Sequence, residues 1–193
     1  MPVAIVTPPA IEPVTLGEAL EHLRLPECDA AERASLMRLI GAARRHVEMF
    51  TRRALIERTL DLKLDGFPAV IEPPQPPLIS VESIKYVDTG GDEQTLDEAK
   101  YTVDTTSDPG RITPAHSESW PSTLGHVNDV TLRYKAGYGA KRSDVPEQAR
   151  QAMLLMIGDW YSNRESVVVG TITSEVPNTA KALMAGITIL EAV

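Results

Sequence analysis

The sequence has one cysteine, few aromatic residues and no long apolar run. Cys28 stands alone, so the chain forms neither an intrachain disulfide nor a cysteine-based zinc site. No stretch of about 18 apolar residues occurs, so we expect no membrane-spanning helix. The first residues lack a basic region followed by an apolar stretch, so we expect no secretory signal. A reducing compartment, or indifference to redox conditions, fits this composition.

Composition and net charge indicate a folded, acidic protein. The 193 residues are 42% hydrophobic and 24% charged, which excludes a wholly disordered chain. The 27 acidic residues outnumber the 19 lysines and arginines, so the formal net charge is −8. A generally acidic chain is a poor candidate for wrapping duplex DNA, because binding of that kind depends on cationic side chains facing phosphates.

The charges are unevenly distributed along the chain. Residues 33–58 contain seven arginines against two acidic residues, whereas residues 59–132 contain 13 acidic residues against four basic ones. Such a division suits contact between unlike faces, either in a head-to-tail assembly or in docking on a larger partner. Two solvated faces of a monomer would produce the same division, so charge alone leaves both interpretations open.

The first quarter of the chain predicts an arm and two helices. Residues 1–14 contain four prolines, which predict an extended N-terminal arm. Thr15 and Asp29 are the expected N-caps of the helices, because a glutamate follows each of them three residues later. The apolar steps of three and four residues predict that these helices cover residues 16–24 and 30–53.

Helical spacing returns after residue 140. Asp144 is the expected N-cap of a third helix, and Pro146 lies in its expected first turn, where proline is tolerated. The apolar residues that follow widen beyond one stripe, so this helix is expected to be covered on more than one side. Residues 178–191 predict a last helix whose apolar side chains are Ala182, Leu183, Ile187 and Leu190.

The middle of the chain changes to the period of a strand. Leucines at 60, 62 and 64 alternate with polar residues, which predicts a half-buried strand. Further strands are expected near residues 80–88, 101–104, 111–113 and 130–135. Because helices and strands are grouped, we expect an α+β fold with a helical core made from both chain ends and an inserted β-rich lobe. The expected boundaries are residues 15–58 and 141–193 for the core and 59–140 for the lobe.

Residues for catalysis are not arranged in a known pattern. The four histidines show no metal-ligand spacing, and the sequence contains neither a nucleophile elbow nor a phosphate-binding loop. A two-metal enzyme would need the acidic residues of the lobe to converge, and solvated turn residues are the simpler interpretation. We therefore expect no enzyme, no cofactor and no metal site. The acidic residues in question are Asp88, Asp92, Glu93, Asp97 and Glu98.

Three features favour contacts with other proteins. Arg38, Arg45 and Arg52 recur every seven residues and share one helix face. Residues 160–165 combine the Trp, Tyr and Arg typical of interface hot spots, although Trp160 in the core is an equally good interpretation. Residues 165–176 are rich in β-branched side chains, and an exposed segment of that kind pairs readily with a neighbour's sheet edge. The expected interface residues are Arg38, Arg45, Arg52, Tyr161, Arg164, Val167, Val169, Ile172, Leu183 and Ile187.

Several segments, taken in their order and spacing, resemble one protein family across residues 15–165. They are Leu16–Arg24, Ala42–Ile56, Asp65–Pro68, Pro76–Val81, Tyr101–Asp104, Trp120–Pro121, Ala136–Gly139 and Pro146–Glu165. Together they resemble the head–tail connector (adaptor) proteins of long-tailed bacteriophages, prophages and gene transfer agents. That family has a helical core, often with a β-rich insertion.

The resemblance implies structural work in the neck of a virion that is assembled in the bacterial cytoplasm. Such adaptors form a ring of about twelve copies under the portal protein and extend the channel for double-stranded DNA without reading its sequence. The ring provides a platform for the stopper or tail-completion protein, and no membrane is involved. Residues after about 165 are expected to face the portal.

Other interpretations remain open at this point. The chain could be the stopper or tail-completion protein of the same particle. It could be a nucleic-acid-binding packaging protein that uses the arginines of the second helix. A metal-dependent packaging enzyme that uses the carboxylates of the lobe is the third.

Overall fold

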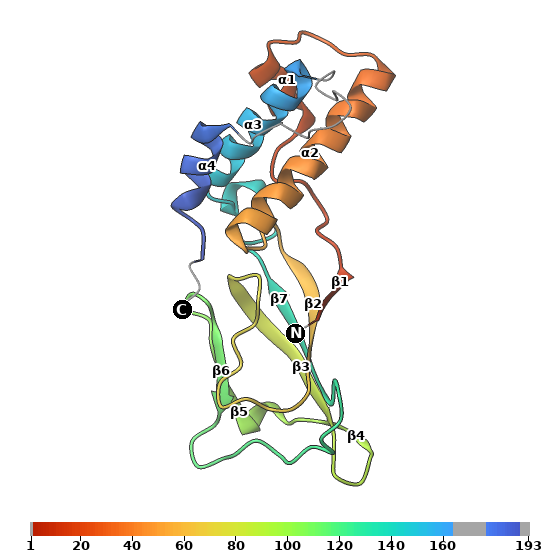
Figure 1. The fold of residues 1–193 in the computed structure, drawn as a ribbon, viewed down its shortest axis with the longest axis vertical. Helices are drawn as coiled ribbons and strands as arrows, with labels where there is room; N and C mark the ends of the chain where they lie inside the picture. The colour runs from red at the N-terminus through yellow and green to blue at the C-terminus, as the bar shows by residue number, and fades with distance from the viewer. Residues whose placement is uncertain (1, 164–176, 190–193) are drawn as a thin grey trace, which may run out of the picture. The chain divides into compact units, whose positions relative to one another are not determined.

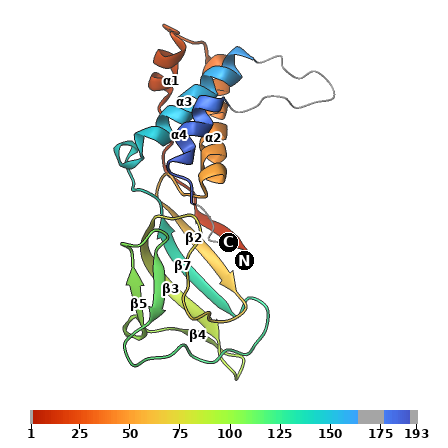
Figure 2. The ribbon, with the colours of Figure 1, turned by 60° about the vertical axis from the view of Figure 1, so that its left-hand side comes forward.

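The computed structural model describes residues 2–163 and 177–189 and divides the chain into two units, each with its own core. The β unit consists of residues 1–10 and 57–139, and the helical unit consists of residues 11–56 and 140–193. Figures 1 and 2 show the course of the chain through both. The grouping of helices and strands confirms the expected α+β fold.

Five antiparallel strands form the main sheet of the β unit, and β2, β7 and β3 lie side by side at its centre (Figure 2). Apolar residues alternate with polar ones along β2 and β7, so one face of the sheet is buried. Leu60 lies opposite Tyr134 and Leu62 opposite Leu132, and all four are fully buried. In order across the sheet the strands are β1 (Val3–Thr7), β2 (Arg58–Leu64), β7 (Val130–Ala136), β3 (Leu78–Val87) and β4 (Glu93–Thr95).

β1 (Val3–Thr7) lies within residues 1–14, for which the sequence predicts an extended arm. Val3 pairs with Leu62 and Ile5 with Leu60, so β1 lies at the edge of the sheet beside β2. The prolines at positions 2, 8 and 9 flank this strand without interrupting it. A pairing partner 55 residues away in the sequence therefore converts part of the expected arm into a strand.

A two-stranded sheet completes the β unit. It pairs β5 (Tyr101–Asp104) with β6 (Arg111–Pro114), and Ile112 of β6 exchanges two backbone hydrogen bonds of 2.9 Å with Ile71. The Tyr134 hydroxyl donates to the Pro74 carbonyl at 2.7 Å, and burial raises the pKa of that hydroxyl. The proline-rich segment is thereby held against the buried face of β7. A short 3₁₀ helix, η1 (Glu98–Lys100), precedes β5.

Four α-helices form the described part of the helical unit: α1 (Leu16–Leu23), α2 (Ala30–Thr51), α3 (Glu147–Ser162) and α4 (Asn178–Ala185). The predicted stripe of α2 is buried at Leu36, Ile40 and Val47, and α3 and α4 supply the facing apolar residues. The buried residues of α3 are Ala149, Ala152, Met153, Met156 and Ile157. No helix in the described ranges is both long and apolar enough to cross a membrane.

The helix starts predicted at Thr15 and Asp29 are confirmed. Thr15 forms a capping box with Glu18, in which each side chain bonds the other residue's amide. The Asp29 carboxylate accepts from the Glu32 amide at 2.7 Å. The first two helices end at Arg24 and Arg52, which adopt left-handed conformations with φ of 56° and 59°.

The prediction that Asp144 caps the third helix is wrong. Asp144 belongs to a short 3₁₀ helix, η2 (Arg142–Asp144), and its carboxylate accepts from the Lys141 amide at 3.0 Å. Pro146 is the N-cap of α3 and does not lie in its first turn. The reason is steric, because a proline disfavours helical conformation in the residue before it and the helix cannot begin earlier.

The last helix is shorter than predicted and buries a different face. α4 ends at Ala185, and Gly186 is its C-cap, whereas a helix over residues 178–191 was expected. Ala180 and Met184 are fully buried, while Ala182 is exposed and Leu183 is half-buried. In a helix of two turns, one pair spaced i, i+4 is enough to make the contact with the helix beneath.

Candidate subunit interface

The exposed side of α2 carries the predicted arginines. Arg38 and Arg45 are exposed, and among residues 2–163 and 177–189 neither has an ion-pair partner. Met49 lies one turn beyond Arg45 on the same side and is 72% exposed, and Arg52 is exposed where the helix ends. We call Arg38, Arg45, Met49 and Arg52 the Arg face. It combines positive charge with a large apolar side chain that has no cover from the described residues.

Arg44 shows why the neighbouring arginines are not equivalent. Its side chain is only 11% exposed and binds Glu12 at 2.7 Å and Glu48 at 2.9 Å. Glu48 is one turn along α2, and Glu12 lies in the segment that leads into α1. Arg44 thus holds the helical unit together, while Arg45, the next residue, points away from that core.

The predicted hot spot at the end of α3 is partly used inside the fold. The Tyr161 hydroxyl donates to the Glu32 carboxylate of α2, and Tyr161 is half-buried. Trp160 is also half-buried and packs edge-on against His46 of α2, with ring centroids 6.2 Å apart. These contacts favour the core interpretation of Trp160 and leave one side of Tyr161 accessible.

Of the other expected interface residues, two are described. Leu183 and Ile187 are half-buried, and the Ile187 carbonyl accepts from Arg53 Nε at 2.5 Å, which ties the end of α4 to the end of α2. This bond uses the Ile187 backbone and not its side chain. Arg164, Val167, Val169 and Ile172 lie outside the described residues.

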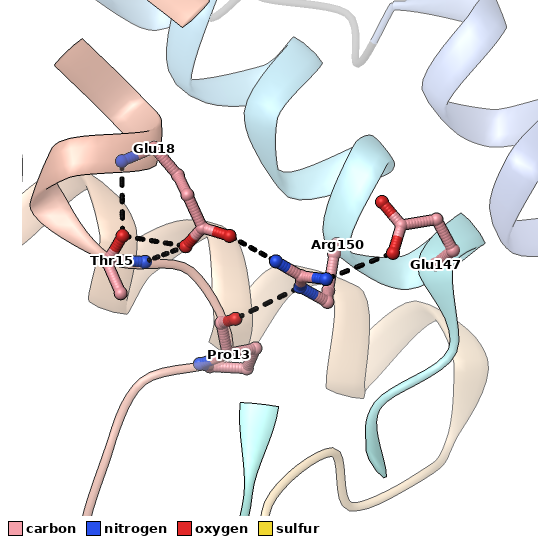
Figure 3. A network of polar contacts seen from close by, with 5 residues as sticks. All are labelled: Pro13, Thr15, Glu18, Glu147 and Arg150. Atoms are coloured by element: carbon pink, nitrogen blue, oxygen red, sulfur yellow. Dashed lines mark hydrogen bonds and ion pairs between the residues drawn. The ribbon is translucent and has the colours of Figure 1, made fainter. Parts of the chain in front are cut away.

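A polar network centred on Arg150 fixes the start of α1 against α3 (Figure 3). The Arg150 guanidinium binds the Glu18 carboxylate, the Glu147 carboxylate at 3.0 Å and the Pro13 carbonyl at 3.3 Å. Burial raises the pKa of Glu18, but hydrogen bonds from Thr15 and the charge of Arg150 outweigh burial and lower that pKa below its usual value. The network thereby orients α1 relative to α3.

The acidic residues of the β unit act separately. Asp88 accepts from the amides of Gly90 and Asp92 and from the Gln94 side chain, and the Gln94 bond is the main reason its pKa is lowered. Glu93 pairs with Lys85 at 2.8 Å, and Asp97 caps η1. No group of three possible metal-ligating side chains occurs in the part of the chain that the structure describes. Asp88, Glu93 and Asp97 thus stabilise a turn, a strand pair and the start of a 3₁₀ helix.

Two hollows open beside β2 in the β unit, and sequence patterns gave no sign of them. One has a volume of about 550 Å³ and is lined by Pro2, residues 63–68, Val127 and Asn128. The other has a volume of about 300 Å³ and a mostly apolar lining of Leu62, Leu64, Pro68, Val70, Ile71 and Glu72. Val127 and Val70 are 77% and 40% exposed, so apolar surface continues beyond both hollows.

Known proteins resemble this chain in their structures, whereas searches by sequence find no match. No family model and no curated protein matches the chain. A chain in the neck of an empty gene transfer agent (GTA) particle, computed with C6 symmetry, matches with a TM-score of 0.80 and 25% identity. The match covers 100% of this chain and 98% of the other. The chain is structurally similar to a GTA neck protein over its whole length.

Two further structures extend this similarity. A chain in the virion of the native GTA particle matches with a TM-score of 0.81 and 25% identity, again over 100% of this chain and 98% of that one. A chain in the native GTA neck, computed with C12 symmetry, has a TM-score of 0.74 at 24% identity over the same shares and shows the shared fold. These matches confirm the resemblance to the head–tail connector family. The matched chains belong to the neck and the virion of the GTA particle, which agrees with the location in the virion neck that the sequence predicts.

Proposed function

We propose that the chain is a head–tail connector (adaptor) that forms a ring beneath the portal protein, extends the DNA channel and carries the stopper or tail-completion protein. The observation that carries the proposal is the match to a GTA neck chain over the full length of both proteins. The C6 symmetry of that neck supports assembly as a ring. The proposal makes the protein a structural part of the virion and not an enzyme.

The charge of each unit suits a channel through which DNA must slide. The β unit has 14 acidic and seven basic residues, a net charge of −7. The helical unit has 13 acidic and 12 basic residues, a net charge of −1. Neither unit offers the excess of cations that retains duplex DNA, so phosphates would pass without being held.

We propose that the Arg face is one of the two surfaces that meet when neighbouring subunits of the ring make contact. A ring of identical subunits needs two different complementary patches on each copy, because heterologous contacts close the circle. Arg38 and Arg45 are exposed and have no ion-pair partner in the described ranges, and the β unit of a neighbouring copy supplies net negative charge. We assign the second patch to that β unit.

Co-sedimentation with the portal ring of the same particle, followed by negative-stain imaging, tests the function. The expected result is a ring stacked coaxially on the portal. Absence of binding, with the portal intact and this chain folded, contradicts the adaptor role and favours tail completion. Duplex-DNA binding that falls steeply with salt would instead favour the nucleic-acid-binding alternative.

Charge reversal tests the proposed contact. The double variant Arg38→Glu, Arg45→Glu is expected to keep its fold, since both side chains are exposed, and to lose ring assembly on the portal. The matched control is Arg38→Lys, Arg45→Lys, which keeps both charges and should assemble. Circular dichroism checks the fold of each variant. Normal rings from the glutamate variant would contradict the role of the Arg face.

A further inference from the structure

Met49 is the most exposed large apolar side chain that the structure describes in the helical unit. It is 72% exposed, Arg45 lies one turn before it on α2, and Arg52 is the C-cap of that helix. Helical period places these three residues opposite the buried stripe of α2. Methionine and arginine are enriched at protein–protein interfaces, where lysine and glutamate are depleted. The Arg face therefore has the composition of a contact surface, with an apolar side chain between two arginines.

The β unit contains a hollow with complementary chemistry. Its volume is about 300 Å³, and its lining consists of five apolar residues and one charged residue, Glu72. We call it the Glu72 hollow. Glu72 is exposed and forms no ion pair with any described residue. Pockets for small ligands range from roughly 300 to 1,000 Å³, so this hollow suits a single inserted side chain better than a cofactor.

Contacts within the β unit hold the walls of the Glu72 hollow in place. Leu62 and Leu64 are buried residues of β2, and Ile71 exchanges two backbone hydrogen bonds of 2.9 Å with Ile112 of β6. Val70, beside Ile71, also lines the hollow and is 40% exposed, so it offers apolar surface to a partner. A preformed hollow of this kind loses little conformational freedom when a side chain enters it.

The second hollow of the β unit is a poorer match for the Arg face. This hollow of about 550 Å³ includes Lys63 in its lining, and a lysine repels an approaching arginine. Its carboxylate belongs to Asp65, which already accepts from the Asn128 amide at 2.9 Å. Charge therefore favours the Glu72 hollow as the partner of the Arg face.

We propose that Met49 of one copy inserts into the Glu72 hollow of the neighbouring copy, with Arg45 paired to Glu72. The contact rests on the proposed function, because it specifies which part of the β unit receives the Arg face in the ring. Side chains four residues apart on a helix have Cβ atoms about 5–6 Å from each other, so Arg45 can reach the rim when Met49 enters. The unbranched methionine side chain adapts to an irregular hollow. Each subunit then carries two different patches, as a closed ring requires.

Shortening Met49 tests the insertion. Met49→Ala removes an exposed side chain, so the variant is expected to fold, and its ring occupancy on the portal should fall at least tenfold. Met49→Leu keeps an apolar side chain of similar volume and should assemble. Met37→Ala is the matched control, since Met37 is 48% exposed on α2 but lies outside the Arg face. Wild-type ring occupancy in Met49→Ala would overturn the proposal.

An exchange of charges tests the pairing of Arg45 with Glu72. Arg45→Glu and Glu72→Arg should each lose rings, and the double variant should recover most of the wild-type ring occupancy, because the ion pair is restored in reverse. Arg45→Glu with Asp92→Arg is the control. It adds the same charge at an exposed position elsewhere in the β unit and should not recover rings. A double variant that assembles no better than Arg45→Glu alone would overturn the proposal.

Cross-linking in mixed rings identifies the two copies in contact. In a Cys28→Ser background, Met49→Cys and Val70→Cys are made as separate proteins, mixed in equal amounts with the portal and oxidised. We expect covalent dimers that contain one copy of each, and none from Met37→Cys mixed with Val70→Cys. Absence of dimers from the first mixture, while wild-type rings form, would overturn the insertion and leave the adaptor function standing. Absence of wild-type rings on the portal would contradict both.

Discussion

Gly110 sits where no larger residue fits. A Cβ atom added there would lie 2.6 Å from Leu78 Cβ and 3.0 Å from the Asp104 carbonyl, and such contacts force the neighbouring backbone to move. We predict that Gly110→Ala lowers the free energy of unfolding by about 1–3 kcal/mol. Gly66→Ala is the control in the same unit, since its nearest atom would be 3.8 Å away. Urea denaturation measures both, and equal midpoints would contradict the steric account.

Asp61 makes the stability of the β unit depend on pH. It lies opposite Arg133 on the neighbouring strand and accepts from its guanidinium at 2.8 and 2.9 Å, and these bonds lower the pKa of Asp61. A lowered pKa contributes stability that is present above the usual aspartate value, about 4, and is lost as pH falls below it. We predict that Asp61→Asn loses less stability than wild type between pH 7 and 3.

Denaturation midpoints at the two pH values test the role of Asp61. Asp92→Asn, which changes an exposed carboxylate without an ion pair in the described ranges, is the control and should behave as wild type. An unchanged pH dependence in Asp61→Asn would show that other carboxylates dominate acid denaturation.

The first helix depends on its cap. Thr15 accepts from the Glu18 amide and also bonds the Glu18 carboxylate, which in turn binds Arg150 (Figure 3). We predict that Thr15→Ala lowers the free energy of unfolding by about 1 kcal/mol, because an N-cap bond and part of the network are lost. Thr15→Ser keeps the hydroxyl and should stay within a few tenths of wild type. Thermal denaturation of wild type, Thr15→Ala and Thr15→Ser compares their stabilities.

Elements with a strong local signal were predicted well, and those set by distant contacts were not. The strand predicted over residues 101–104 is β5, and the caps at Thr15 and Asp29 are confirmed, because their signals lie within a few residues. β1 was expected only as an extended arm, since its partner β2 begins about 50 residues later. The same holds for the described residues of the candidate interface. The exposure of Arg38 and Arg45 could be predicted, because it follows from the helical period of α2. The hydrogen bond from Tyr161 to Glu32 could not be predicted, because the two residues are 129 positions apart in the sequence.

At the scale of the whole molecule, charge predicts how the protein meets DNA. The net charge of −8 resides mainly in the β unit, and the exposed arginines of α2 are few. We predict no retention of duplex DNA at physiological salt and no steep change in affinity between about 50 and 200 mM salt. Fluorescence anisotropy with a labelled duplex measures this. A loss of affinity of a thousandfold over that range would reveal many phosphate contacts and contradict the channel model.

The placement of β1 also has a consequence for biosynthesis. β1 leaves the ribosome before the strands it joins, because β2 begins some 50 residues later and β7 only at residue 130. The centre of the sheet cannot close until most of the chain has been made, and α2 must likewise wait for α3. Nascent chains therefore expose apolar strands and an unsatisfied helix face for most of translation, which creates a need for chaperones before any subunit reaches the portal.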